Sequence, residues 1–263
     1  MARCAKAIAK VKFAAPLIMG NTQSNNEARI AIEADFKWDR QDAYLFDIDG
    51  TLLRSRDRVH FDSVAASVHR VTGFEITLAG VLIHGSTDTA ILREAYRQAG
   101  LPAQVLEEQY EAILEAMRNC VAERRHELDP IVMPGVNDVL HYLGQKGALL
   151  GVASGNLETI GWIKIEAAGL RQWFKFGGFS DHFPVRSELI GSAADKAREL
   201  AGKGAQICVV GDTPRDIEAA RANFLSVIAV ATGRYSFDEL LECQPEACVS
   251  SLADLLASSR VRL

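Results

Sequence analysis

The stretch YLFDIDGT (residues 44–51) places two carboxylates directly after a short apolar run. Tyr44 to Phe46 predicts a buried strand, and side chains two residues apart on a strand point to the same side. Asp47 and Asp49 should therefore begin on one side of the chain, and Gly50 lets the backbone turn sharply after them. Two carboxylates at the end of a buried strand need partners, because burying an unpaired charge is costly.

Two arrangements would satisfy this pair of carboxylates. A divalent cation could bind both, because hard cations prefer carboxylate and carbonyl oxygens. Alternatively, one carboxylate could act as a nucleophile and the other as a general acid and base. A solvated turn is the plainer alternative, since Asp and Gly are common turn residues. The apolar strand directly before the pair argues against that alternative.

The bulk composition excludes several classes of protein. The chain has 263 residues, 48% hydrophobic and 24% charged, which is typical of a folded protein. Its net charge of -5 argues against general binding to nucleic acid. The five cysteines are scattered, so we expect neither a zinc site nor a disulfide framework, and a reducing, cytoplasmic location fits best. No run of about 20 apolar residues occurs, so we expect no membrane partner.

The order of patterns along the chain predicts a two-part architecture. Residues 1–40 are hard to interpret, and we expect an extension that is flexible or packs as a helix. Residues 41–56 and 134–263 alternate apolar strands with helical patterns, which predicts a parallel sheet with helices on both faces. Residues 57–133 contain helical patterns and no convincing buried strand, as expected for an inserted lid domain. Such sheets bind ligands at the carboxyl ends of their strands.

Two further predicted strands end in polar residues. Ser154 and Gly155 follow an apolar strand and precede a helix, where a hydroxyl and backbone N–H groups could bind a phosphate. Asp212 and Asp216 follow the strand at 207–210. Helix capping is the alternative for Ser154, and it is also the alternative for the two aspartates.

These motifs resemble those of one enzyme family. The sequence FDIDGTL (residues 46–52) resembles motif I of the haloacid dehalogenase (HAD) superfamily of phosphatases. Ser154 matches the Ser/Thr of motif II, and Gly211 to Asp216 resembles the Gly-Asp-x-x-x-Asp form of motif IV. For motif III, a Lys or Arg, we favour Arg186 over Lys196, which falls inside a helical pattern.

The resemblance implies a fold and a mechanism. The fold would be a Rossmann-like α/β core with a helical "C1" cap, as in phosphoglycolate phosphatase-like and β-phosphoglucomutase-like members. Asp47 would be the nucleophile and Asp49 the general acid and base. Phosphate would bind to Ser154, Gly155 and Arg186. Mg²⁺ would be held by Asp47, the backbone carbonyl of Asp49, and Asp212, with Asp216 as a ligand or a support.

The substrate and the alternatives stay open at this point. The segment HGSTD (residues 84–88) could form a specificity loop through His84 and Thr87, but ordinary helix capping explains it equally well. We expect a monomer or dimer that acts on a small phosphorylated metabolite: phosphoglycolate, a sugar phosphate or a nucleotide. A sugar phosphomutase would use the same two carboxylates, although such members usually carry Val where Thr51 stands here. A non-enzymatic binding protein would not need the whole set of site residues.

Overall fold

A seven-stranded sheet forms the centre of the larger part of the molecule. The computed structural model describes residues 28–260. The strands of the sheet are β1 (Ile30–Ile32), β2 (Ala43–Phe46), β5 (Leu149–Ala153), β6 (Phe176–Gly178), β7 (Ile207–Gly211), β8 (Ser226–Val230) and β9 (Ala247–Val249). Their order is β1-β9-β8-β7-β2-β5-β6. β1 pairs antiparallel with β9, and the other pairings are parallel.

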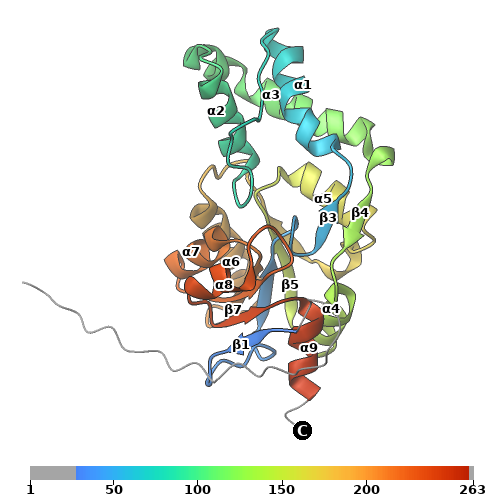
Figure 1. Cartoon of the computed structure of the whole chain (residues 1–263), viewed down its shortest axis with the longest axis vertical. Helices are drawn as coiled ribbons and strands as arrows, with labels where there is room; N and C mark the ends of the chain where they lie inside the picture. Colours follow the sequence, from blue (N-terminus) through green and yellow to red (C-terminus); the bar gives the residue numbers. More distant parts are fainter. Residues whose placement is uncertain (1–27, 261–263) are drawn as a thin grey trace, which may run out of the picture.

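Helices cover both faces of the sheet, which confirms the predicted fold class (Figure 1). On one face lie α4 (Val136–Gln145), α5 (Glu158–Ala167) and α9 (Leu252–Arg260), and on the other lie α6 (Arg186–Ala201), α7 (Pro214–Ala222) and α8 (Phe237–Glu242). The short η2 (Arg171–Trp173) follows α5. Strand β2 serves both faces because its side chains alternate. Tyr44 and Phe46 join the first apolar cluster, and Ala43 and Leu45 the second.

A helical insert stands over the carboxyl ends of the strands (Figure 1). It contains α1 (Val59–Thr72), α2 (Asp88–Gln98), α3 (Ala103–Glu123) and the short η1 (Arg125–Glu127). These helices share an apolar cluster of their own, which also includes Leu157 and Ile160 of the core. The insert, called the cap below, therefore packs directly on the beginning of α5.

Two short strands connect the cap to the core. β3 (Leu53–Ser55) and β4 (Pro130–Val132) pair antiparallel as a separate two-stranded sheet. The sequence indicated no strand in the region of β4. The reason is that its three residues are only half-buried, so they do not form the buried apolar run on which strand prediction depends.

The segment before residue 41 differs from the prediction where the structure describes it. Ile30 pairs with Val249, and Ile32 pairs with Ala247, so β1 is an edge strand of the core. Phe36 and Trp38 are buried in the first apolar cluster. The prediction of an extension up to residue 40 was therefore wrong for residues 28–40. A three-residue strand is stabilised by its partner strand rather than by its own sequence, so the local sequence does not indicate it. Residues 1–27 of the expected extension lie outside the described residues.

Within residues 28–260, no helix is long and apolar enough to cross a membrane. The four cysteines in this range are all free thiols. The absence of a disulfide among these residues agrees with the scattered spacing of the cysteines.

Candidate active site

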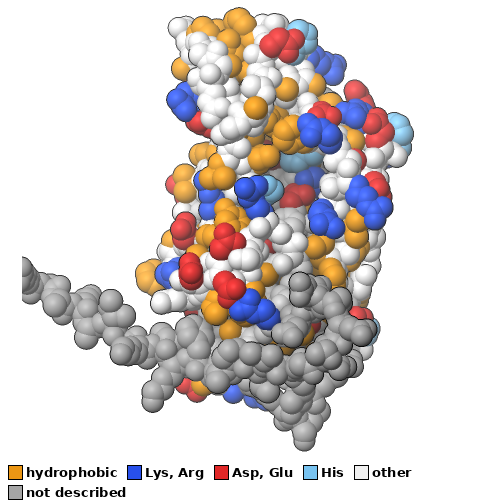
Figure 2. Space-filling view, viewed as in Figure 1, with side chains coloured by type: hydrophobic (Ala, Val, Ile, Leu, Met, Phe, Trp, Pro, Cys, Tyr) orange, Lys and Arg blue, Asp and Glu red, His pale blue; other side chains and the backbone are white. Residues whose placement is uncertain are grey.

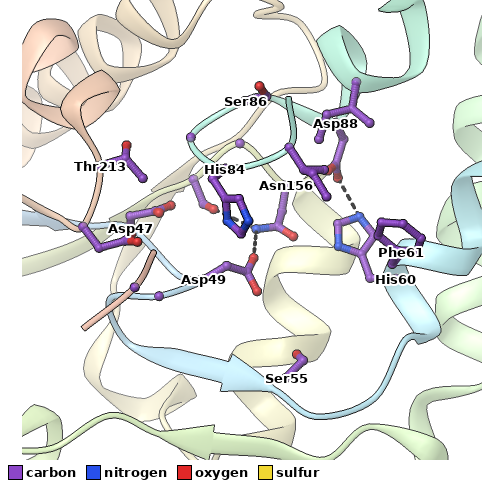
Figure 3. Close-up of a pocket in the computed structure, with 18 of the residues that line it drawn as sticks. Asp47, Asp49, Ser55, His60, Phe61, His84, Ser86, Asp88, Asn156 and Thr213 are labelled. Carbon is purple, nitrogen blue, oxygen red and sulfur yellow. Dashed lines mark hydrogen bonds and ion pairs between the residues drawn. The ribbon is translucent and has the colours of Figure 1, made fainter. Parts of the chain in front are cut away.

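A cavity of about 490 Å³ lies where the cap meets the core. Its floor is formed by residues that follow β2, β5 and β7, three adjacent strands whose carboxyl ends meet at one edge of the sheet. Asp47, Ser154 and Asp212 each follow one of these strands. Figure 3 shows the Asp47 side chain in the pocket. Figure 2 shows Lys, Arg and His side chains gathered near this level of the molecule. The topology thus brings together residues that are far apart in the sequence.

Three aspartates form a buried acidic cluster on the cavity floor. One carboxylate oxygen from each of Asp47, Asp212 and Asp216 lies within 4.8 Å of the others. Burial, followed by repulsion from Asp47 and Asp216, raises the pKa of Asp212 to about 8. Burial also raises the pKa of Asp47 to about 6, although Arg186 opposes this shift. The cluster therefore carries more negative charge than its protein surroundings neutralise.

Two glycines leave room for the Asp212 carboxylate. A Cβ atom at Gly50 or at Gly233 would collide with this carboxylate. Gly50 also has a φ of 90°, a conformation that side chains disfavour. The hydroxyl of Thr51 donates to Asp212 Oδ1 at 3.2 Å. The second carboxylate oxygen packs closely against both glycines, and all three residues line the cavity.

The position of Asp216 is set by protein donors. Its Oδ1 accepts from Arg186 Nε at 2.9 Å, and its Oδ2 accepts from the backbone N–H and the hydroxyl of Thr213 at 3.0 and 2.6 Å. Thr213 and Asp216 thus form a capping box at the start of α7. Because both oxygens of Asp216 are engaged, Asp47 and Asp212 are the members of the cluster with oxygens available to a ligand.

Arg186 brings a fixed positive charge to the cavity. It is the first residue of α6, it is 8% exposed, and its Nη2 lies 3.1 Å from Asp47 Oδ1. Lys196, the rival for this role, donates instead to the backbone carbonyl of Gly177 in β6 at 2.8 Å and does not line the cavity. Of the two cations, the structure therefore places Arg186 beside the carboxylates.

Asp49 is held by two residues that the sequence analysis did not identify. Lys164 Nζ lies 2.9 and 2.8 Å from the two carboxylate oxygens, and Asn156 Nδ2 donates to Oδ2 at 2.8 Å (Figure 3). Lys164 also donates to Asn156 Oδ1 at 2.8 Å. Burial would raise the pKa of Asp49, but Lys164 and Asn156 lower it below its ordinary value. The Asp49 side chain remains 45% exposed towards the cavity.

One sequence signal could have identified Lys164. The residue follows Ile160 by four positions on α5, so both lie on one face of the helix. This face is buried, and Lys164 is only 4% exposed. A lysine on the buried face of a helix needs a carboxylate partner, and that requirement points to the acidic strand ends.

Ser154 and Gly155 lie between the core and the cap. The hydroxyl of Ser154 accepts a hydrogen bond from Asn156 Nδ2 at 2.8 Å and lines the cavity. A Cβ atom at Gly155 would collide with the backbone carbonyl of Ser86. The carbonyl of Gly155 accepts from the backbone N–H of Asp88 at 2.7 Å. Glycine is thus required here by the close approach of the cap loop.

Of the two predicted specificity residues in the cap loop, only one lines the cavity. His84 lines the cavity, and burial, followed by the nearby Arg234, lowers its pKa (Figure 3). Thr87 does not line the cavity. Its hydroxyl accepts from Ala90 N at 3.2 Å as the N-cap of α2 and donates to Pro184 O at 2.8 Å. The specificity role was wrong for Thr87, because capping occupies its hydroxyl.

Asp88, like Lys164 and Asn156, has a role that the sequence did not indicate. Its Oδ2 accepts from the backbone N–H of Leu157 at 2.8 Å and lies 3.0 Å from His60 Nε2 (Figure 3). Ser86 accepts from Arg215 Nη1 at 2.7 Å, also across the boundary between cap and core. The loop before α2 is therefore fastened to the core by several hydrogen bonds and lies over one side of the cavity.

An α/β core with carboxylates at adjacent strand ends, covered by a helical cap, defines a class of capped hydrolytic enzymes. Comparison with known proteins identifies the family within this class. The model of the haloacid dehalogenase-like hydrolases matches residues 41–223, so the chain belongs to this family.

Proteins of known sequence and structure agree with this assignment. The chain is 25% identical to the "Probable phosphatase IndB" of Dickeya dadantii over 83% of this chain and 94% of that protein. It is 26% identical to a phosphoglycolate phosphatase of Synechococcus elongatus, over 81% and 95%. A predicted phosphatase from Clostridium acetobutylicum has the same fold, with a TM-score of 0.61 at 21% identity, over 85% and 99% of the two chains. Family and relatives together support a phosphatase enzyme.

Proposed function

We propose that this protein is a Mg²⁺-dependent phosphatase that hydrolyses a small phosphate monoester through an aspartyl-phosphate intermediate. The observation that carries this proposal is the placement of Arg186 3.1 Å from Asp47, with Asp49 facing the same cavity. A nucleophilic carboxylate, a cation for the phosphoryl oxygens and a second carboxylate for proton transfer are the groups that this reaction needs.

The acidic cluster fits a hard divalent cation. Asp47 and Asp212 retain oxygens for a ligand, and burial raises the pKa of both carboxyl groups, which a bound cation would oppose. These two carboxylates and the backbone carbonyl of Asp49 would hold Mg²⁺, and Asp216 would support Arg186 and Thr213. When bound, the ion would offset the repulsion between the phosphate and Asp47.

The first half of the reaction forms the intermediate. A carboxylate oxygen of Asp47 attacks phosphorus in line, and the bond from phosphorus to the leaving oxygen breaks. A protonated Asp49 would give its proton to the leaving alkoxide, so this step uses the protonated form that Lys164 and Asn156 disfavour in the free protein. Arg186, the Ser154 hydroxyl and the backbone N–H of Gly155 would bind the phosphoryl oxygens as their charge is redistributed.

The second half releases phosphate. Asp49, now a carboxylate, removes a proton from water as the water oxygen attacks phosphorus, and Asp47 is regenerated. Lys164 and Asn156 would keep the Asp49 carboxylate oriented during this step. The loop fastened by Asp88 would shield one side of the reacting groups from bulk water.

A panel of phosphomonoesters tests the proposal directly. With Mg²⁺, the protein should hydrolyse p-nitrophenyl phosphate and alkyl phosphates, and EDTA should abolish this activity until Mg²⁺ is restored. β-Glucose 1-phosphate in the panel should yield inorganic phosphate rather than glucose 6-phosphate, which separates a phosphatase from a mutase. Full activity after exhaustive chelation would overturn the metal assignment.

Substitution of the nucleophile sharpens this test. Asp47→Asn should lower kcat at least about 10⁴-fold, because no covalent intermediate can form. The fold should persist, since the change removes a carboxylate that is costly to bury. Asp62→Asn, which alters a carboxylate on α1 outside the cavity, is the matched control and should keep its activity. Turnover by Asp47→Asn at the wild-type rate would exclude Asp47 as the nucleophile.

A further inference from the structure

The cap end of the cavity has an apolar wall. Figure 3 shows Phe61 on the opposite side of the pocket from Asp47. Other apolar side chains from α1, from the segment before α2, and from α2 itself also line the cavity. The wall consists of Phe61, Val64, Leu78, Ile83 and Ile91.

These side chains form the cavity-facing surface of the cap's own apolar cluster. Val64, Leu78 and Ile91 are buried members of that cluster, and Phe61 and Ile83 are half-buried residues packed against it. The Arg58 guanidinium lies 4.3 Å from the centre of the Phe61 ring and covers one of its faces. The wall is thus an ordered part of the cap and not an isolated exposed residue.

The polar neighbour of Phe61 on α1, His60, is engaged with another residue of the cap. His60 lies beside Phe61, but its Nε2 faces Asp88 at 3.0 Å. The hydrogen bonds that Asp88 and Ser86 make to the core hold the loop above the cavity in place. The wall therefore has a fixed shape before any ligand binds, which reduces the entropic cost of binding.

The size of the cavity exceeds what a phosphate group needs. Pockets for small organic molecules occupy about 300–1,000 Å³ and are lined mainly by apolar side chains with a few placed polar groups. The cavity of about 490 Å³ lies in that range. Its charged end would bind the phosphoryl group, so the apolar end is left for the alcohol part of the ester.

Resting on the proposed function, we propose that the substrate's alcohol part carries an apolar face about the size of an aromatic ring, which packs against Phe61 and its neighbours. A two-carbon alcohol, such as that of phosphoglycolate, would leave most of this wall in contact with water. Burial of apolar area favours binding roughly in proportion to that area. The wall therefore selects bulkier, partly apolar phosphomonoesters.

Two esters with similar alkyl leaving groups test this inference. With saturating Mg²⁺, 2-phenylethyl phosphate should be hydrolysed with a kcat/KM about 10- to 100-fold above that of ethyl phosphate, mostly through a lower KM. Phosphoglycolate should resemble ethyl phosphate. A ratio near one, or a preference for phosphoglycolate, would overturn the inference while leaving the proposed phosphatase activity intact.

A pair of variants locates the effect. Phe61→Ala should reduce the ratio of kcat/KM values for 2-phenylethyl phosphate and ethyl phosphate at least about fivefold. The reason is that the phenyl ring of the substrate would lose the surface against which it packs. Phe74→Ala removes a ring that packs against the same cap cluster but does not line the cavity, and it should keep the wild-type ratio. If circular dichroism shows both variants folded and they change the ratio equally, the wall is not the source of selectivity.

Binding of stable analogues separates the two proposals. 2-Phenylethylphosphonate should bind at least about tenfold tighter than ethylphosphonate in calorimetry with Mg²⁺. This comparison does not require turnover. Failure to hydrolyse any ester, including p-nitrophenyl phosphate, would overturn the proposed function, and equal affinities for the two phosphonates would overturn the apolar wall.

Discussion

The two ends of the cavity are built by different means. At the core end, charged or polar groups follow the parallel strands β2, β5 and β7, so the backbone of the sheet fixes where they lie. At the cap end, the wall consists of side chains from helix faces and a loop, and their positions depend on how the cap packs. At the core end, charged groups would be recognised by a few partners in fixed positions. At the cap end, binding would depend on the apolar area that the ligand contacts.

This difference has a consequence for mutations. Loss of a charged group at the core end should slow every substrate, because each ester presents the same phosphoryl group. Changes at the cap end should alter the ranking of substrates, because the alcohol parts differ. The experiments below can contradict or refine this division.

The largest expected effect concerns the cation of the core end. Arg186→Ala should lower kcat roughly 10²–10³-fold for all substrates, because a preorganised positive charge beside Asp47 is lost. Lys196→Ala, which removes a cation from the same helix, should be nearly silent in kinetics. Steady-state kinetics on three unrelated esters checks this. If Arg186→Ala slowed only one ester, the proposed division of roles between the core end and the cap end would be contradicted.

A smaller effect is expected at Lys164, which lies in the core but packs below the cap. Lys164→Gln should lower kcat for ethyl phosphate about 10- to 100-fold, because Asp49 loses the group that orients it. The loss should be smaller with p-nitrophenyl phosphate, whose leaving group needs no proton. Lys175→Gln, on an exposed lysine, is the control. An equal loss on both esters would mean that Lys164 supports the fold rather than Asp49.

The smallest effect concerns stability at the core end. Without metal, the pKa of Asp212 is raised to about 8, so the folded state binds more protons than the unfolded state from about pH 4 to pH 8. The free energy of unfolding should therefore fall as pH rises through this window. For EDTA-treated protein, we expect a decrease in Tm of a few degrees between about pH 5 and pH 8.

Two controls refine this measurement. Mg²⁺ should raise Tm more at the higher pH, where the cluster is most charged. Asp212→Asn should flatten the dependence of Tm on pH, whereas Asp62→Asn on the cap should not. A Tm that rises with pH in the metal-free protein would contradict the assigned direction of the pKa shift.

The core end could be anticipated from short motifs. Asp47, Ser154 and Asp212 each follow an apolar run, and parallel strands place their carboxyl ends together. The position of Arg186 before a helical pattern favours it over Lys196, and its guanidinium lies beside Asp47. Short motifs were sufficient to identify these residues because the parallel sheet topology brings the strand ends together.

The exact partners in other contacts could not be anticipated because these contacts join distant segments. Lys164 and Asp49 are 115 residues apart, and their contact depends on which face of α5 packs on the core. Asp88 reaches Leu157 across 69 residues. Thr87 could serve as a specificity residue or as a cap on sequence alone, and only its position relative to Pro184 decides between them.

Strand β1 has a consequence for where this protein can be cut. The family match begins at residue 41, but the fold includes β1 and the buried side chains Phe36 and Trp38. A fragment starting at residue 41 would leave β9 as an edge strand with open hydrogen-bonding groups. Such edges recruit strands from other molecules, so the fragment would be prone to aggregate. The practical boundary of the folded unit therefore lies before Ile30, ahead of the first residue of the family match.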